Sequence, residues 1–248
     1  MNRWMIYIGW PNNPLTSKVD IIINGSSAVN VLLPNDGGSL GPRAIGVLGG
    51  LDLHGVSRAV SWTRLASTAS AGQTSITLSE AVDWVSGDEI LLTTTDTRID
   101  HAERRTIASV SGGGTVITLT SALTYTHNVI HNAFPNGQIY HVAGAVGLLT
   151  RNIRVMTPNS ASGKMGFRVF VTSYATDIWN PVGNEFLTTF YKGYARISNT
   201  QFVNYGQFVD AAYEDKREAI HLYDLGDWNA LRPTYVDSCS FDSGYYSA

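Results

Sequence analysis

The chain has 248 residues, of which 44% are hydrophobic and 15% charged, and its formal net charge is −3. This length and apolar content allow one large domain or two modest ones with a sizeable core. The sequence contains no basic block, so it lacks the electrostatic footprint of a nucleic-acid-binding protein. It has no apolar run of about 18 residues that could span a membrane. The single cysteine, Cys239, excludes an internal disulfide.

Most of the chain has the composition of short β-strands joined by tight turns. Thr, Val and Ile favour strands, and the 24 glycines favour turns. The turn Ser111-Gly112-Gly113-Gly114 predicts a hairpin within residues 103–123. This spacing of strands is typical of sandwiches and barrels. In chain order, the expected strands lie within residues 4–9, 18–25, 44–55, 61–66, 74–82, 88–96, 103–123, 138–144 and 146–157.

After about residue 150 an internal similarity appears between residues 195–206 and 234–245. Ile197 and Phe202 in the first segment correspond to Val236 and Phe241 in the second, at an offset of 39 residues. The strand-like residues 218–223 lie between them. This pattern predicts two stacked solenoid coils of about 20 residues each.

Five motifs carry a family resemblance. They are IYIGWPNNPLTSKVDIIING, GGLDLHG, SWTRL, VDWVSGDEILLTTTD and VGLLTRNIRV, in this order. They resemble the G8-domain family, which includes fibrocystin, fibrocystin-L and the G8-containing cell-surface hyaluronidases. The resemblance covers roughly residues 6–155 and resumes at ISNTQFVNYGQ and YVDSCSF.

The resemblance implies an all-β fold in which a partial G8 β-domain runs into a right-handed parallel β-helix. We expect the G8-like domain in residues 1–150, without its N-terminal strands, and the first coils of a truncated β-helix in residues 151–248. The chain is therefore expected to be a segment of a larger protein. Arg151 and Asn152, between apolar neighbours, are expected to satisfy backbone carbonyls where the two architectures meet.

The histidines do not form a recognisable metal motif. His127 and His131 are four residues apart, but they lie in a segment rich in β-branched and aromatic residues. A strand would hold their side chains too far apart for one ion, and no third ligand is near in the sequence. We expect neither a metal nor another cofactor.

The stretch EAIHLYDLGD is similar to a coil of the hyaluronidase-like family members, in which a second histidine occupies the position of Tyr223. On a strand, His221 and Tyr223 share one face while Asp224 points to the other. Cleavage of a glycosidic bond needs two titratable groups, which His221 with either Asp224 or Asp227 could supply. If the chain is an enzyme, the resemblance implies His221 and Asp227 as its catalytic candidates. The residues that match the family pattern are Ile220, His221, Gly226 and Asp227.

The tyrosine at position 223 favours a scaffold over an enzyme. We expect an extracellular or cell-surface segment of a fibrocystin-L-like protein with a structural, adhesive or filament-forming role. Its expected partners are glycans or other cell-surface proteins, with Tyr205, Tyr223 and Trp228 as glycan-contact candidates and Asn24 as a glycosylation site. The aromatic residues are equally consistent with internal stacking.

Two alternatives stay open. The first is a polysaccharide-degrading enzyme of the hyaluronan type, which the family resemblance implies. The second is self-assembly through the ends of the β-helix, because unpaired strand edges invite pairing with other chains.

Overall fold

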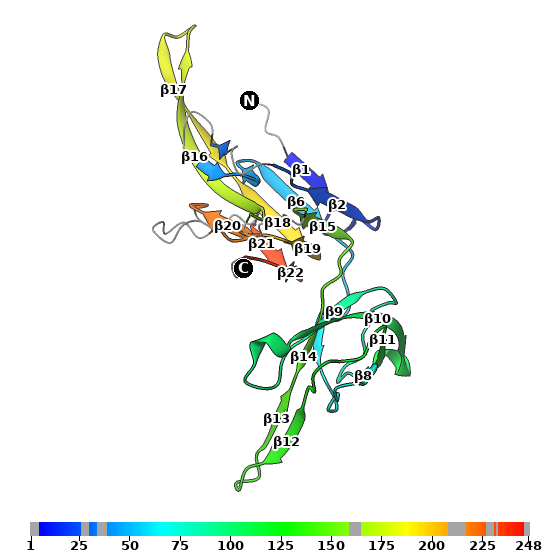
Figure 1. The fold of residues 1–248 in the computed structure, drawn as a ribbon. Helices are drawn as coiled ribbons and strands as arrows, with labels where there is room; N and C mark the ends of the chain where they lie inside the picture. Colours follow the sequence, from blue (N-terminus) through cyan, green and yellow to red (C-terminus); the bar gives the residue numbers. More distant parts are fainter. Residues whose placement is uncertain are drawn as a thin grey trace. The chain divides into compact units, whose positions relative to one another are not determined.

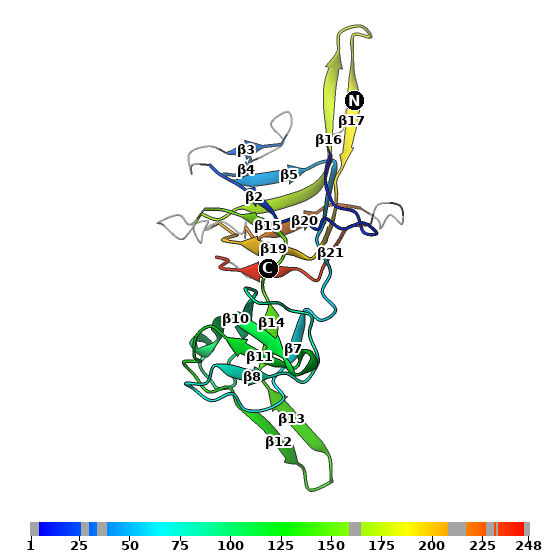
Figure 2. The ribbon, with the colours of Figure 1, turned by 90° about the vertical axis from the view of Figure 1, so that its right-hand side faces the viewer.

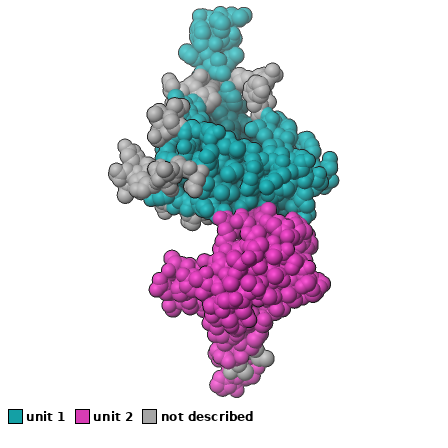
Figure 3. Space-filling view, turned by 45° about the vertical axis from the view of Figure 1, so that its right-hand side comes forward, with its two compact units in different colours: residues 1–57, 151–248 teal, residues 58–150 magenta. Residues whose placement is uncertain are grey.

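The computed structural model describes residues 5–25, 30–33, 39–158, 165–207, 217–226, 231 and 233–245. These residues are almost wholly β-structure, which confirms the expected all-β class; two 3-10 turns, η2 (Ile99–His101) and η3 (Gly112–Gly114), accompany the strands. The described part of the chain contains no helix that is long and apolar enough to cross a membrane. Two compact units are present, residues 1–57 with 151–248 and residues 58–150 (Figure 3).

The first unit consists of parallel strands stacked in three sheets (Figures 1 and 2). Successive strands of each sheet come from successive coils of the chain, as in a parallel β-helix. The first sheet contains β1 (Met5–Ile8), β6 (Gly50–His54), β18 (Tyr194–Ser198) and β21 (Tyr235–Asp237). The second sheet contains β2 (Val19–Ile22), β15 (Ile153–Met156), β19 (Thr200–Val203) and β22 (Ser240–Asp242). The third sheet contains β5 (Ala44–Val47), β16 (Arg168–Asn180) and β20 (Ile220–Tyr223).

Two antiparallel hairpins extend this framework. The short strands β3 (Val31–Leu32) and β4 (Ser39–Gly41) pair with each other ahead of β5. The distal half of β16 leaves the third sheet and pairs with β17 (Glu185–Lys192) in a long ribbon. Figure 1 shows this ribbon extending away from the coils of the first unit.

The strand register confirms the internal similarity and corrects its period. Ile197 is paired with Val236, and Phe202 with Phe241, on adjacent coils. One coil is therefore 39 residues long at this point, and the prediction of two 20-residue coils is wrong. The physical reason is that β20 is the third strand of the same coil, in which long connections join β19 to β20 and β20 to β21.

Residues 44–55 also differ from their prediction as one strand. They form β5 and β6, which lie in different sheets because the chain turns between Val47 and Gly50. The strands before residue 57 already pair in parallel with strands after residue 150. The division into a G8-like domain, residues 1–150, and following coils stays a prediction, since the compact units describe packing and not family boundaries.

Alternate side chains of the coils point inward and form one core. Leu53, Ile197, Phe202 and Val169 belong to a single buried cluster that all three sheets share. The Phe202 and Phe241 rings are stacked with centroids 5.0 Å apart. This ladder of apolar side chains holds successive coils in register.

Sharp corners separate the first sheet from the second. Asn199, between β18 and β19, has φ 51°, a left-handed conformation that asparagine tolerates better than most residues. At the equivalent corner of another coil, a Cβ on Gly55 would lie 2.4 Å from the Asn199 carbonyl oxygen, so only glycine fits.

Arg151 and Asn152 bind backbone carbonyls, as expected. Asn152 Nδ2 donates to the carbonyls of Leu15 and Ser17 at 2.6 and 3.0 Å, and Arg151 Nε donates to that of Ser238 at 3.1 Å. These bonds stabilise turns from several coils at the point where the chain returns to the first unit.

The second unit is a six-stranded antiparallel sheet around its own core. Trp84, Ile90, Ile107 and Ile117 are buried there. The predicted hairpin at residues 111–114 is confirmed between β10 and β11. The sheet order is β7 (Trp62–Arg64), β14 (Ala145–Leu148), β9 (Glu89–Leu92), β10 (Glu103–Ser111), β11 (Val116–Leu119) and β8 (Ser75–Thr77); β12 (Val129–Ala133) and β13 (Ile139–Ala143) form a separate hairpin.

We predict that Ile197→Ala destabilises the first unit by about 2–5 kcal/mol, because it leaves a cavity in the stacked core. Ile22→Ala, at an exposed position of a strand in the same unit, should cost far less. Denaturant unfolding of both variants measures the difference. Equal losses of stability would contradict the assignment of Ile197 to the core.

Candidate functional site

The third sheet presents a polar and aromatic outer face. Along β16, Val169 and Val171 point into the core, so Arg168, Phe170 and Thr172 lie on the opposite side. Parallel pairing of β16 with β20 places His221 beside Phe170 and Tyr223 beside Thr172. The coil register therefore brings residues about 50 positions apart in the sequence onto one surface.

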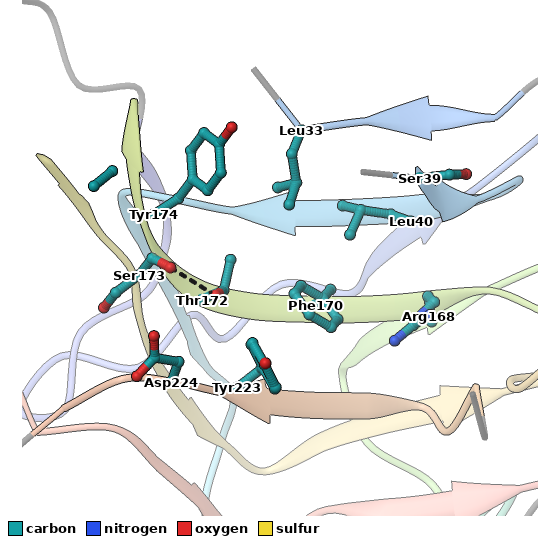
Figure 4. Close-up of a pocket in the computed structure, with 11 residues that line it drawn as sticks. Leu33, Ser39, Leu40, Arg168, Phe170, Thr172, Ser173, Tyr174, Tyr223 and Asp224 are labelled. Carbon is teal, nitrogen blue, oxygen red and sulfur yellow. Dashed lines mark hydrogen bonds between the residues drawn. The ribbon is translucent and has the colours of Figure 1, made fainter. Parts of the chain in front are cut away.

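A groove of about 460 Å³ lies on this face (Figure 4). The β3–β4 hairpin borders one side of it through Leu33 and Leu40, and the end of β20 borders the other side. The groove is lined by Leu33, Ser39, Leu40, Arg168, Phe170, Thr172, Ser173, Tyr174, Ala175, Tyr223 and Asp224.

Arg168 organises the aromatic part of the groove. Its side chain is buried, and its Cζ lies 4.9 Å from the centre of the Phe170 ring, within the range of a cation–π contact. Its Nη2 lies 3.4 Å from His221 Nδ1, so the guanidinium can donate to that nitrogen when it is unprotonated. Phe170 in turn contacts the rings of His221 and Tyr223, with centroids 5.0 and 5.9 Å away.

The groove joins an aromatic surface to hydrogen-bonding groups. The rings of Phe170 and Tyr223, tilted by 31° to each other, supply the apolar surface. The Tyr223 hydroxyl supplies a donor, and Asp224 and the Thr172 hydroxyl, which itself donates to the Ser173 carbonyl, supply acceptors. Such a combination suits a ligand with one apolar face and several hydroxyl groups. Because most of these residues stand on strands, little ordering is needed on binding.

The candidate residues on β20 lie at this groove. Tyr223 is 58% exposed and lines it, whereas His221 flanks it and its Nδ1 is 3.7 Å from Glu218 Oε2. The expectation that Asp224 faces away from Tyr223 is wrong, because both residues line the groove (Figure 4). β20 ends at Tyr223, and Asp224 has φ 48°, so strand alternation no longer applies to it.

The other candidates are dispersed. Tyr205 is only 7% exposed and packs edge-on against Phe241 with ring centroids 5.7 Å apart, the surroundings of a core residue. Asn24 is exposed, as an acceptor of a glycan must be. Asp227 and Trp228 lie outside the described residues.

Arg168 and Phe170 are not among the site residues predicted from the sequence. The run FRVFVT contains the strand alternation that separates inward Phe167, Val169 and Val171 from the outward residues, and this signal could have identified them. Nothing local in the sequence indicates that Leu40, more than 120 residues away, borders the same groove.

The two histidines considered as a metal pair have different surroundings in the second unit. His127 is buried, with Nε2 3.1 Å from Glu103 Oε1, whereas His131 stacks on His141 with centroids 4.2 Å apart. Across the described ranges, no group of three or more His, Cys, Asp or Glu side chains could hold a metal ion.

A second polar cluster lies on the outer side of the first sheet. Asp52 and His54 on β6 are fully buried and pair in register with Arg196 and Ser198 on β18. Arg196 Nε and the Tyr194 hydroxyl donate to Asp52, and His54 Nδ1 lies 2.9 Å from Ser198 Oγ. The cluster binds adjacent coils together through polar groups, on the side of the sheet opposite to the apolar ladder.

Electrostatics in this cluster follow from burial and pairing. Burial lowers the pKa of His54 against the opposing effect of Asp52, so the neutral imidazole is favoured. The hydrogen bond to Asp52 raises the pKa of Arg196. Burial raises the pKa of Tyr194, which keeps its hydroxyl protonated as a donor.

We predict that the chain loses stability as pH falls below about 6.5, the ordinary pKa of an unfolded histidine. The unfolded chain binds a proton at His54 in this range while the folded chain does not, so protonation favours unfolding. Thermal unfolding of wild type at pH 7.5 and 5.5 measures the effect, and each kcal/mol lost lowers the midpoint by roughly 2–4 °C.

His54→Gln should reduce this pH dependence, whereas His131→Gln, on the β12–β13 hairpin, should leave it unchanged. An unchanged pH dependence in His54→Gln would contradict the assignment of the stability loss at low pH to His54.

Comparisons with known proteins point to one family. The G8 domain model matches residues 5–66. Fibrocystin-L of Homo sapiens is 33% identical over 97% of this chain, and the match covers 6% of that protein. Fibrocystin of Canis lupus familiaris is 29% identical over 84% of this chain and 5% of that protein.

Among solved structures, the tailspike gp61 of Pseudomonas phage phi297 is 10% identical, with a TM-score of 0.33, over 98% of this chain and 38% of that chain. The chain spans about 6% of the length of the curated fibrocystin-L that it matches. The sequence matches support the G8 family for this chain, with fibrocystin-L and fibrocystin among its relatives.

Proposed function

We propose that the chain is a structural and adhesive segment of a larger cell-surface or extracellular protein of the fibrocystin-L type. We further propose that the groove on the third sheet binds a glycan. Similarity to fibrocystin-L over nearly the whole chain supports the first part. The exposed Asn24 sequon fits the same extracellular setting.

The groove is the observation that carries the glycan proposal. Pyranose rings have apolar C–H faces and hydroxyl edges, so they suit an exposed aromatic ring beside polar side chains. Tyr223 offers such a ring, and Asp224 and Thr172 lie next to it in the lining of the groove. Phe170 extends the aromatic surface, and the Arg168 guanidinium holds it in place.

The residues of the groove support binding of a glycan more than cleavage of a glycosidic bond. A glycosidase needs two titratable groups on opposite sides of the bond it cleaves. Tyr223 occupies the position where the hyaluronidase pattern has its second histidine, and it lines the groove with an aromatic ring. His221, the catalytic candidate, contacts Arg168 and Phe170 beside the groove.

We predict that Tyr223→Ala weakens glycan binding at least tenfold, a loss of about 1.4 kcal/mol, because the stacking surface is removed. A glycan array probed with the 248-residue chain identifies a ligand, and titration of that ligand measures the variant. Trp62→Ala removes an equally exposed aromatic from the second unit and serves as the matched control.

Three results would contradict the proposal. The first is no binding by wild type to any arrayed glycan, and the second is equal affinities for wild type and Tyr223→Ala. The third is depolymerisation of hyaluronan by wild type that disappears in His221→Ala, which would establish the enzymatic alternative instead.

A further inference from the structure

The ribbon of β16 and β17 presents a long strand edge. Antiparallel pairs run without a register shift from Ser173 and Lys192 at its base to Asn180 and Glu185 near its tip. Among the described residues, β17 pairs with β16 alone. An isolated two-stranded ribbon is only marginally stable in water, so a ribbon of this length calls for a further partner.

The ribbon exposes large apolar side chains. Phe186 is 68% exposed and Phe190 is 71% exposed, and both lie on the same face of β17. Trp179 is opposite Phe186 on β16, with ring centroids 5.0 Å apart. Residues 186–191, FLTTFY, include no charge and no proline, two of the devices that usually protect a strand edge from pairing.

The backbone geometry identifies which residues of β17 direct their N–H and C=O groups to the edge that faces away from β16, here called the free edge. The Gly193 N–H donates to the Thr172 carbonyl at 3.0 Å, so Gly193 points its backbone groups at β16. Because hydrogen-bonding direction alternates along an antiparallel strand, Thr189 and Leu187 also point toward β16. Phe186, Thr188 and Phe190 therefore point their backbone groups at the free edge.

The outward residues of β17 are self-complementary. In an antiparallel pair of identical strands related by a two-fold axis, residues directly opposite each other lie on the same face. Centring the axis on Thr188 places Thr188 opposite itself in the second copy and Phe186 opposite Phe190 of the second copy. Each row of aromatics would then continue from Trp179 and Phe186 onto the second copy.

The charges at the two ends of β17 favour the same orientation. Glu185 is at one end of the strand and Lys192 is at the other. Antiparallel pairing brings the acidic end of one copy near the basic end of the other, whereas parallel pairing would place like charges together.

We propose that the chain forms a symmetric dimer in which two β17 edges pair antiparallel about Thr188, giving a four-stranded sheet. The contact is isologous, so it closes and does not propagate into fibres. The edge of one eight-residue strand is smaller than a typical stable interface of roughly 1,000 Å² or more. The dimer should therefore be reversible and should increase with protein concentration.

Cysteine trapping tests the register. In Thr188→Cys, the two new cysteines face each other with Cα atoms about 5.5 Å apart, within the range of a disulfide. In Thr189→Cys, they are displaced along the strands to roughly 8 Å, beyond that range. Mild oxidation should link the Thr188→Cys chains and leave the Thr189→Cys chains unlinked; both variants keep Cys239, which controls for the native thiol.

Sedimentation velocity tests the association itself. Wild type should show a concentration-dependent dimer. Thr188→Asp should be monomeric because two new carboxylates would meet at the axis, each beside Asp177, which accepts the hydrogen bond of the Thr188 hydroxyl in wild type. Ile130→Asp, on the exposed β12–β13 hairpin, adds the same charge and should still dimerise. Circular dichroism establishes that each variant is folded.

Three results would overturn the proposal. They are a wild type that stays monomeric up to millimolar concentration, a Thr188→Cys variant that does not cross-link, and a Thr189→Cys variant that cross-links equally well.

Discussion

The in-register stacking of parallel coils is the constraint on which the first unit depends. Successive coils contribute strands to three sheets, four to each of the first two sheets and three to the third in the described part of the chain, and inward residues such as Leu53, Ile197 and Phe202 share one core. A shift of one residue between coils would turn every core side chain outward. Asn199, in the left-handed conformation, turns the chain between β18 and β19 within a single residue, so the two strands enter neighbouring sheets in this register.

The same register determines the chemistry of the outer faces. On the first sheet it pairs Asp52 with Arg196, so a buried carboxylate is neutralised by the next coil. On the third sheet it places Phe170 beside His221 and assembles the groove. One stacking rule therefore produces both a polar cluster that joins coils and a surface suited to a ligand.

The sequence predicted features that depend on near neighbours. It identified most strands, the hairpin turn at residues 111–114 and the correspondence of Phe202 with Phe241. It could not reveal that residues 58–150 separate β6 from β15, or that Ile153 pairs with Val19, because no local pattern encodes a partner more than 100 residues away. Asp224 was misplaced because alternation ends where β20 ends, and this boundary has no clear sequence signal.

The most direct test of this account is a crystal structure of the chain with a glycan that it binds. The account predicts β20 paired with β16, Phe170 beside His221, and a sugar ring against the face of Tyr223. A sugar bound away from the third sheet, or a β20 strand that does not pair with β16, would contradict the claim that coil register builds the binding surface.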